Sequence, residues 1–133
     1  MDIYAKTVKL NDKDFKEIIG VKRTTFEAMV TILKKAYAAR PNKHRGGRKK
    51  KLSIEEQLIL TLKYERYYVT QKALAFEFEV GEATVSGTIK WVENTLIKDG
   101  SFYAYYFFEI FIIQFNCLRI NVHFITLLYN NTF

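Results

Sequence analysis

The sequence has few of the residues that bind metals or form cross-links. Its 133 residues include one cysteine, Cys117, and two histidines, His44 and His123, which lie far apart. A single thiol excludes an internal disulfide and a cysteine-based zinc site, and the isolated histidines have no companions at ligand spacing. We therefore expect neither a metal site nor a cofactor.

The first ten residues, MDIYAKTVKL, lack the apolar stretch of a signal peptide. This absence predicts a cytoplasmic protein. Positive charge, in contrast, is in excess, with 21 lysines and arginines against 14 acidic residues and a formal net charge of +7. Such a balance favours a polyanionic partner, either nucleic acid or an anionic membrane surface.

Charged residues are almost missing from the end of the chain. Residues 101–133 contain one basic residue, Arg119, and one acidic residue, Glu109, but 11 of the 21 aromatic residues. Lysine does not occur after Lys98. The composition therefore changes near Gly100, and the two sides of this point are treated as different segments.

Apolar residues recur at helical spacing through the first hundred residues. A short helix capped by Asn11 or Asp12 is expected to end by Gly20. The next helix must end before Pro41, and its buried stripe consists of Phe26, Met29, Val30, Leu33 and Tyr37.

Three further helices are predicted after the basic stretch RPNKHRGGRKKK. Ser53 and Glu56 form a capping box that opens the first of them, and its buried stripe is Ile54, Leu58 and Leu62. Thr70 caps the second, which has Leu74 and Phe78 on one face. Glu82 or Ala83 starts the third, with an apolar stripe of Val85, Ile89, Val92 and Leu96.

The last two helices have the spacing of a helix-turn-helix unit. Such a unit needs a small residue where the helices cross, an apolar residue in the turn and apolar anchors on the second helix. Ala75 and Val80 meet the first two needs, and Val85 and Ile89 meet the third. An ordinary corner of a helical bundle is the alternative interpretation.

The fold class that follows is all-α: a small helical bundle with a helix-turn-helix, plus an aromatic-rich C-terminal tail. The predicted segments are an N-terminal helical segment (1–39), a basic linker (40–52), a helix-turn-helix domain that binds DNA (53–100) and an apolar aromatic tail (101–133).

The candidate DNA contacts lie on the second helix of this unit and in the linker. The outer face of the helix is short and polar, as entry into a major groove about 12 Å wide requires. Basic linker side chains can contact phosphates, although a solvated loop is the alternative. The full candidate set is Arg45, Arg48, Lys49, Lys50, Lys51, Thr70, Gln71, Glu82, Ala83, Thr84, Ser86, Gly87 and Lys90.

The segment GRKKKLSIEEQLILTLKYERYYVTQKALAFEFEVGEATVSGTIKWVENTLIK resembles the N-terminal helix-turn-helix domain of insertion-sequence transposases of the DDE superfamily. The preceding IIGVKRTTFEAMVTILKKA resembles the segment that comes before that domain, so the resemblance covers residues 12–98. Its most specific parts are KLSIEEQL and TIKWVENTLI. The resemblance implies that double-stranded DNA, specifically the terminal inverted repeats of an element, is the partner.

Two positions depart from the usual pattern of such units. Glu79 stands where glycine is common, and we expect Gly81 to relieve the backbone of the turn instead. Gly87 stands where a basic residue is common, so this helix forfeits one phosphate or guanine contact and Lys90 is the cation that remains on the face.

By resemblance, a catalytic domain with three metal-binding carboxylates should follow. Residues 101–133 cannot supply the several carboxylates of two-metal chemistry. We therefore expect a truncated or frameshifted copy that is not an enzyme.

Three hypotheses for the tail stay open: an out-of-frame product, a membrane-inserted segment, and extra structure that covers the bundle. The apolar run 102–115 has 14 residues, whereas a spanning helix needs about 20. The alternative functions are a small helix-turn-helix transcriptional regulator and a small membrane-associated basic protein. The chain itself or an intact transposase is an open second partner, and no small-molecule substrate is expected.

Overall fold

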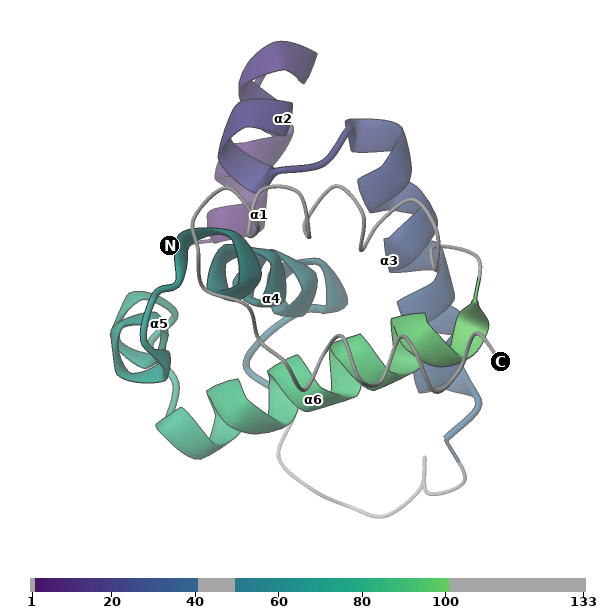
Figure 1. The fold of residues 1–133 in the computed structure, drawn as a ribbon, viewed down its shortest axis with the longest axis vertical. Coiled ribbons are helices and arrows are strands. Elements are labelled where there is room, and N and C mark those ends of the chain that lie inside the picture. Colours follow the sequence, from purple (N-terminus) through teal and green to yellow (C-terminus); the bar gives the residue numbers. More distant parts are fainter. Residues whose placement is uncertain (1, 41–49, 101–133) are drawn as a thin grey trace.

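The computed structural model describes residues 2–40 and 50–100, and within these ranges it contains six helices and no strand (Figure 1). The predicted all-α bundle is confirmed. In order, the helices are α1 (Ile3–Val8), α2 (Asp12–Ile19), α3 (Arg23–Ala38), α4 (Ile54–Tyr67), α5 (Gln71–Glu77) and α6 (Glu82–Asp99). The sequence did not predict α1, because six residues are too few for an apolar stripe to repeat.

Side chains cap four of these helices as the local sequence dictates. The Asn11 side chain accepts a hydrogen bond from the Asp14 amide at 2.7 Å, which decides between the two predicted caps of α2. Ser53 and Glu56 form both bonds of the capping box, at 3.2 and 3.1 Å. Thr70 accepts from the Ala73 amide at 3.1 Å and caps α5. These bonds satisfy amides that have no partner inside a helix. Asp2 caps α1 in the same way.

Helix α4 forms the centre of the bundle (Figure 1). Leu58, Ile59 and Leu60 are all fully buried, although three consecutive helical residues point in three different directions. The predicted stripe was therefore too narrow, and Ile54 at its start is only half-buried. A helix that is buried on several sides needs neighbours on each of them.

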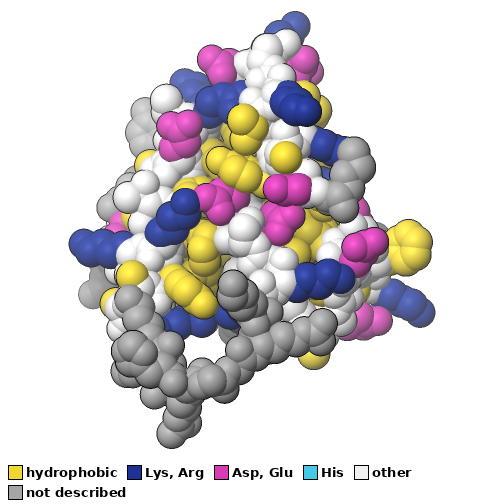
Figure 2. All heavy atoms as spheres, turned by 180° about the vertical axis from the view of Figure 1, so that it is seen from behind, with side chains coloured by type: hydrophobic (Ala, Val, Ile, Leu, Met, Phe, Trp, Pro, Cys, Tyr) yellow, Lys and Arg dark blue, Asp and Glu magenta, His cyan; other side chains and the backbone are white. Residues whose placement is uncertain are grey.

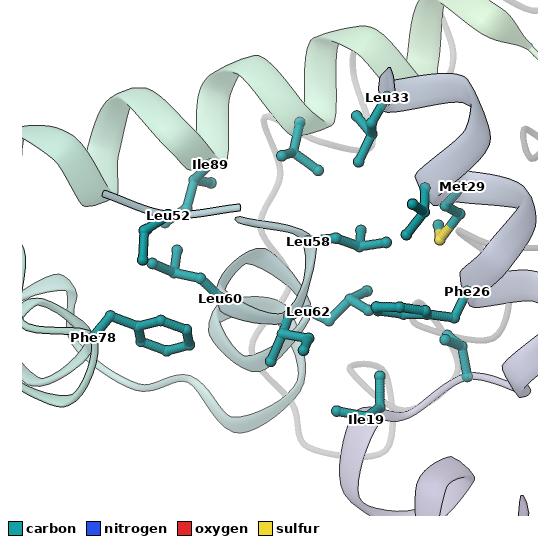
Figure 3. Close-up of a cluster of buried hydrophobic side chains, with 14 of the residues drawn as sticks. Ile19, Phe26, Met29, Leu33, Leu52, Leu58, Leu60, Leu62, Phe78 and Ile89 are labelled. Atoms are coloured by element: carbon teal, nitrogen blue, oxygen red, sulfur yellow. The ribbon is translucent and has the colours of Figure 1, made fainter. Parts of the chain in front are cut away.

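The core extends to both sides of α4 (Figure 3). Leu58 and Leu62 lie toward Phe26 and Met29 of α3. Leu60 lies on the other side, toward Phe78 at the end of α5 and Ile89 of α6, together with Leu52. The N-terminal helices and the last two helices thus pack on one common hydrophobic core.

The end of α4 is fastened to the end of α2. Arg66 donates a hydrogen bond to the Lys16 carbonyl at 3.2 Å, and the Tyr67 hydroxyl donates to the Ile18 carbonyl at 2.8 Å. Gly20 ends α2 with φ of 97°, a conformation that glycine adopts without steric cost. The predicted end of this helix is confirmed.

The predictions for the tail fall on residues 101–133, which lie outside the described residues. No helix in the ranges 2–40 and 50–100 is both long enough and apolar enough to span a bilayer. On the face turned away from Figure 1, acidic and basic side chains are interspersed (Figure 2).

Helices α4 and α6 bring two carboxyl groups together, those of Glu65 and Glu93. Burial raises the pKa of Glu93 to about 9, and the hydrogen bond with Glu65 and the repulsion between the two charges act in the same direction. At neutral pH Glu93 therefore stays protonated and hydrogen-bonded to Glu65 in the folded protein, whereas the same group is ionised in the unfolded chain.

We predict that stability falls as pH rises, and that Glu93→Gln removes much of this fall. The raised pKa means that the contribution of Glu93 is complete below its unfolded value of 4.5 and is lost progressively toward pH 9. Glutamine keeps the hydrogen bond without ionising, so at pH 8 it should stabilise the fold by about 1 kcal/mol, allowing for solvent screening. Urea unfolding from pH 5 to pH 9 measures this. Glu27→Gln on the exposed face of α3 is the control, and equal pH profiles for wild type and Glu93→Gln would contradict the prediction.

Candidate nucleic-acid interface

Helices α5 and α6 form the predicted helix-turn-helix unit. The chain reverses in a tight turn in which the Val80 amide donates to the Ala75 carbonyl at 3.0 Å. Ala75 is buried where the helices meet, and Val85 and Ile89 anchor α6 on the core. Val80 packs half-buried against the same core. Each position that the sequence marked as small or apolar therefore has the expected burial.

The backbone of the turn differs from the expectation. Glu79 has φ of 55°, the left-handed region, whereas Gly81 is extended, with φ of −76° and ψ of 154°. The prediction that Gly81 relieves the turn was wrong, because Gly81 is the residue that precedes α6 and the reversal occurs at Glu79. A side chain in the left-handed region costs about 1 kcal/mol relative to glycine. The Lys51 ammonium donates to the Glu79 carbonyl, a contact that favours this backbone conformation.

The first turns of α6 present a small, exposed face. Glu82, Ala83, Thr84, Gly87 and Lys90 are exposed, while the apolar anchors lie on the opposite side of the helix. This arrangement follows from the helical period, which returns a residue to the same face after three or four positions.

Two of the other candidate residues are less accessible than the sequence suggested, while Thr70 is exposed. Ser86 is half-buried and lies at the edge of the exposed face. The Thr70 hydroxyl accepts the capping hydrogen bond of α5, and Gln71 at the start of that helix is half-buried. Arg45, Arg48 and Lys49 fall outside the described residues.

The end of the basic linker lies beside the turn. A hollow of about 630 Å³ separates them, and its lining includes Lys50 and Lys51 of the linker, Glu79 of the turn, and Thr84 and Gly87 of α6. Gln57 helps to fix this placement, because its side chain donates to the Leu52 carbonyl at 3.1 Å while Leu52 itself is buried. The structure thus brings two predicted linker cations next to the predicted face of α6.

The sequence did not predict an aromatic pair, Tyr37 and Trp91, next to the same hollow. The two rings meet edge to face, with centroids 6.4 Å apart. Tyr37 was expected in the buried stripe of α3, but its side chain is 40% exposed. The guanidinium of Arg40 lies 4.7 Å from the centre of the Trp91 ring, and the Lys50 ammonium lies 5.4 Å from it.

Burial lowers the pKa of Lys50, and the positive charge of Arg40 lowers it further. Arg40 was counted in the basic linker, but nothing in the local sequence showed that it would meet Lys50 on an aromatic surface. The sequence offered one signal for this cluster, Trp91, which is the single tryptophan of the chain and lies in TIKWVENTLI, one of the two most specific parts of the resemblance.

We predict that Glu79→Gly stabilises the fold and that Glu79→Gln does not. Glycine removes the cost of a side chain in the left-handed region and should raise the free energy of unfolding by about 0.5–1 kcal/mol. Glutamine keeps that cost and removes only the charge. Urea unfolding of the three proteins measures the difference. An equal gain in both variants would assign the effect to the charge and contradict the backbone explanation.

Comparisons with known proteins agree with this geometry. Residues 50–102 match the family model for the helix-turn-helix of DDE superfamily endonuclease. The chain is also similar to a probable transposase for insertion sequence element IS702 from Microchaete diplosiphon, with 34% identity over 97 residues. The aligned part covers 73% of this chain and 34% of the relative, so the chain spans about a third of that protein. No solved structure matches. The resemblance stated from the sequence is confirmed.

Proposed function

We propose that residues 50–102, a helix-turn-helix domain of the kind found in DDE superfamily endonucleases, bind duplex DNA with α6 in the major groove. The exposed first turns of α6 carry this proposal. Their side chains are short, so the helix can approach base edges closely, while Val85 and Ile89 hold its other side on the core.

Specific base contacts are proposed for the exposed face of α6. Thr84 offers a hydroxyl group, which can hydrogen-bond to a base edge or to a phosphate. Lys90 is the exposed cation further along the face and can reach guanine acceptors. Glu82 can accept a hydrogen bond from a cytosine amino group, although it would repel a phosphate in the same place. Ala83 and Ser86 complete the set with small side chains that allow close approach.

Phosphate contacts are proposed for the linker and for the start of α5. Lys51 already touches the turn, so its charge lies close to the strand that would pass the beginning of α6. Arg45, Arg48 and Lys49 are adjacent in sequence and are proposed to extend this contact along the same backbone. Thr70 and Gln71 would contact phosphate through the first turn of α5.

The DNA that we propose is the terminal inverted repeat of an insertion element. The relative with 34% identity is a probable transposase for an insertion sequence element, and its similarity extends over 97 residues. A protein that handles such an element must locate its ends. The ends of the element that encodes this chain are therefore the first duplexes to test.

Fluorescence anisotropy of the full chain with labelled duplexes tests the proposal. The terminal repeat should bind more tightly than a shuffled duplex of the same composition at each salt concentration. Lys90→Ala should reduce the preference between the two by about 1–3 kcal/mol, because a base contact discriminates by that amount. Changing Lys49, Lys50 and Lys51 together to alanine should weaken binding to both duplexes alike. It should also reduce the slope of log affinity against log salt concentration by about 0.9 per lost contact. Equal affinity of the wild type for both duplexes would contradict sequence-specific binding.

Gly87 allows a second test of where α6 faces. A Cβ atom built at this position meets nothing within 4 Å, so a side chain there enters open space. Gly87→Ala should stabilise the fold by about 1 kcal/mol, since glycine is unfavourable inside a helix. Gly87→Lys should in addition raise the affinity for any duplex about eightfold at about 0.1 M salt, the value of one phosphate contact. Weaker binding of the lysine variant than of the alanine variant would show that this face does not meet the DNA backbone.

A further inference from the structure

Two cations, Arg40 and Lys50, lie together on the aromatic pair. Arg40 lies within 5.0 Å of the Tyr37 ring centre, and Lys50 within 5.2 Å of the same ring. Both also lie close to the Trp91 ring. In the parts of the chain that the structure describes, neither side chain forms an ion pair with a carboxylate. No ion pair among the described residues therefore offsets their mutual repulsion.

The positions of the two charges are fixed before any ligand arrives. Tyr37 comes from α3 and Trp91 from α6, and these two helices pack against each other. Cation–π attraction holds each charge on a surface that the core itself positions. These contacts restrict the two side chains in part, so less side-chain entropy is lost when an anion binds.

The same two side chains line the hollow beside the turn. Lys51 contributes a third positive charge and Thr84 an exposed hydroxyl group, while Trp91 offers an apolar surface. Glu79 also lines the hollow, and its negative charge would direct an anion away from the turn and toward Arg40 and Lys50. A volume of about 630 Å³ is large enough for a phosphodiester together with its sugar.

We propose that Arg40 and Lys50, held on Tyr37 and Trp91, bind a backbone phosphate of the duplex that α6 contacts. This inference rests on the proposed function and adds Arg40, just after the end of α3, to the phosphate contacts beside the helix-turn-helix. The phosphate lies between the two cations, and the deoxyribose packs on the exposed part of Trp91. The site fixes the register of the domain on the duplex, because phosphate contacts position a protein while base contacts select the sequence.

Trp91 is the single tryptophan of the chain, so its fluorescence reports directly on this hollow. We would titrate the full chain with the terminal-repeat duplex and, separately, with inorganic phosphate, and record both tryptophan emission and anisotropy of the labelled duplex. The duplex should change the emission with the same affinity that anisotropy reports. Inorganic phosphate should change it only weakly, because it lacks the rest of the duplex.

Arg40→Gln and Lys50→Gln each remove one charge and keep most of the aliphatic stem. Each should lower the affinity for the duplex about eightfold at about 0.1 M salt and reduce the salt slope by about 0.9. Arg40→Lys keeps the charge and should keep the slope. Lys13→Gln on the exposed surface of α2 is the matched control, since it removes the same charge at the other end of the molecule (Figure 1).

The outcomes separate the two proposals. If the wild type does not bind the duplex, the proposed function fails and this site fails with it. If the wild type binds but Arg40→Gln and Lys50→Gln keep its affinity and slope, DNA binding stands and the phosphate site is wrong. Loss of affinity in Arg40→Lys as well as Arg40→Gln, with an unchanged slope, would assign Arg40 a purely structural role and also overturn the site. Emission that responds equally to inorganic phosphate and to the duplex would make the hollow a general anion site instead.

Discussion

The rest of the structure depends on the burial of α4 on several sides at once. Leu58, Ile59 and Leu60 are consecutive and fully buried, so no single neighbouring helix could cover them. Helix α3 covers one side, and α5 and α6 cover the other (Figure 3). A helix-turn-helix pair alone buries too small a core to fix the angle between its two helices. Here the angle is set by α4, which both helices contact, and through α4 by the N-terminal helices as well.

The start of α4 also positions the linker. The capping box at Ser53 fixes where the helix begins, and Gln57 holds the Leu52 carbonyl one turn earlier. Burial of Leu52 in the core then leaves the preceding lysines at the surface beside the turn. Burying a glutamine side chain costs free energy unless it is hydrogen-bonded. The bond to the Leu52 carbonyl therefore both offsets the burial of Gln57 and positions the end of the linker. Lys50 and Lys51 are thus held beside the helix-turn-helix by the same residues that complete the core.

Local features were predictable from the sequence, and those set by distant contacts were not. The caps at Asn11, Ser53 and Thr70 involve residues three positions apart, and the anchors of α6 follow one helical period, so pattern alone located them. Tyr37 fitted the apolar period of α3, but periodicity shows only on which face of the helix a side chain lies. It does not show how completely another element covers that side chain. The conformation of Glu79 likewise involves Lys51, 28 positions earlier. A glycine two residues away was a misleading signal because the site of reversal is decided by the packing of both helices.

In the candidate site, too, the local features were predictable and the contacts between distant residues were not. These distant contacts affect the stability of the fold. The exposed face of α6 followed from its period, whereas the meeting of Arg40, Lys50 and Trp91 requires the fold to be complete. Holding two cations together on the aromatic pair opposes folding, as the lowered pKa of Lys50 indicates. An anion that settles between them removes this cost only in the folded protein. Any ligand with this preference shifts the folding equilibrium toward the native state. Binding at this hollow and the stability of the whole bundle are therefore coupled, and the strength of that coupling is set by how closely Tyr37 and Trp91 hold the two charges together.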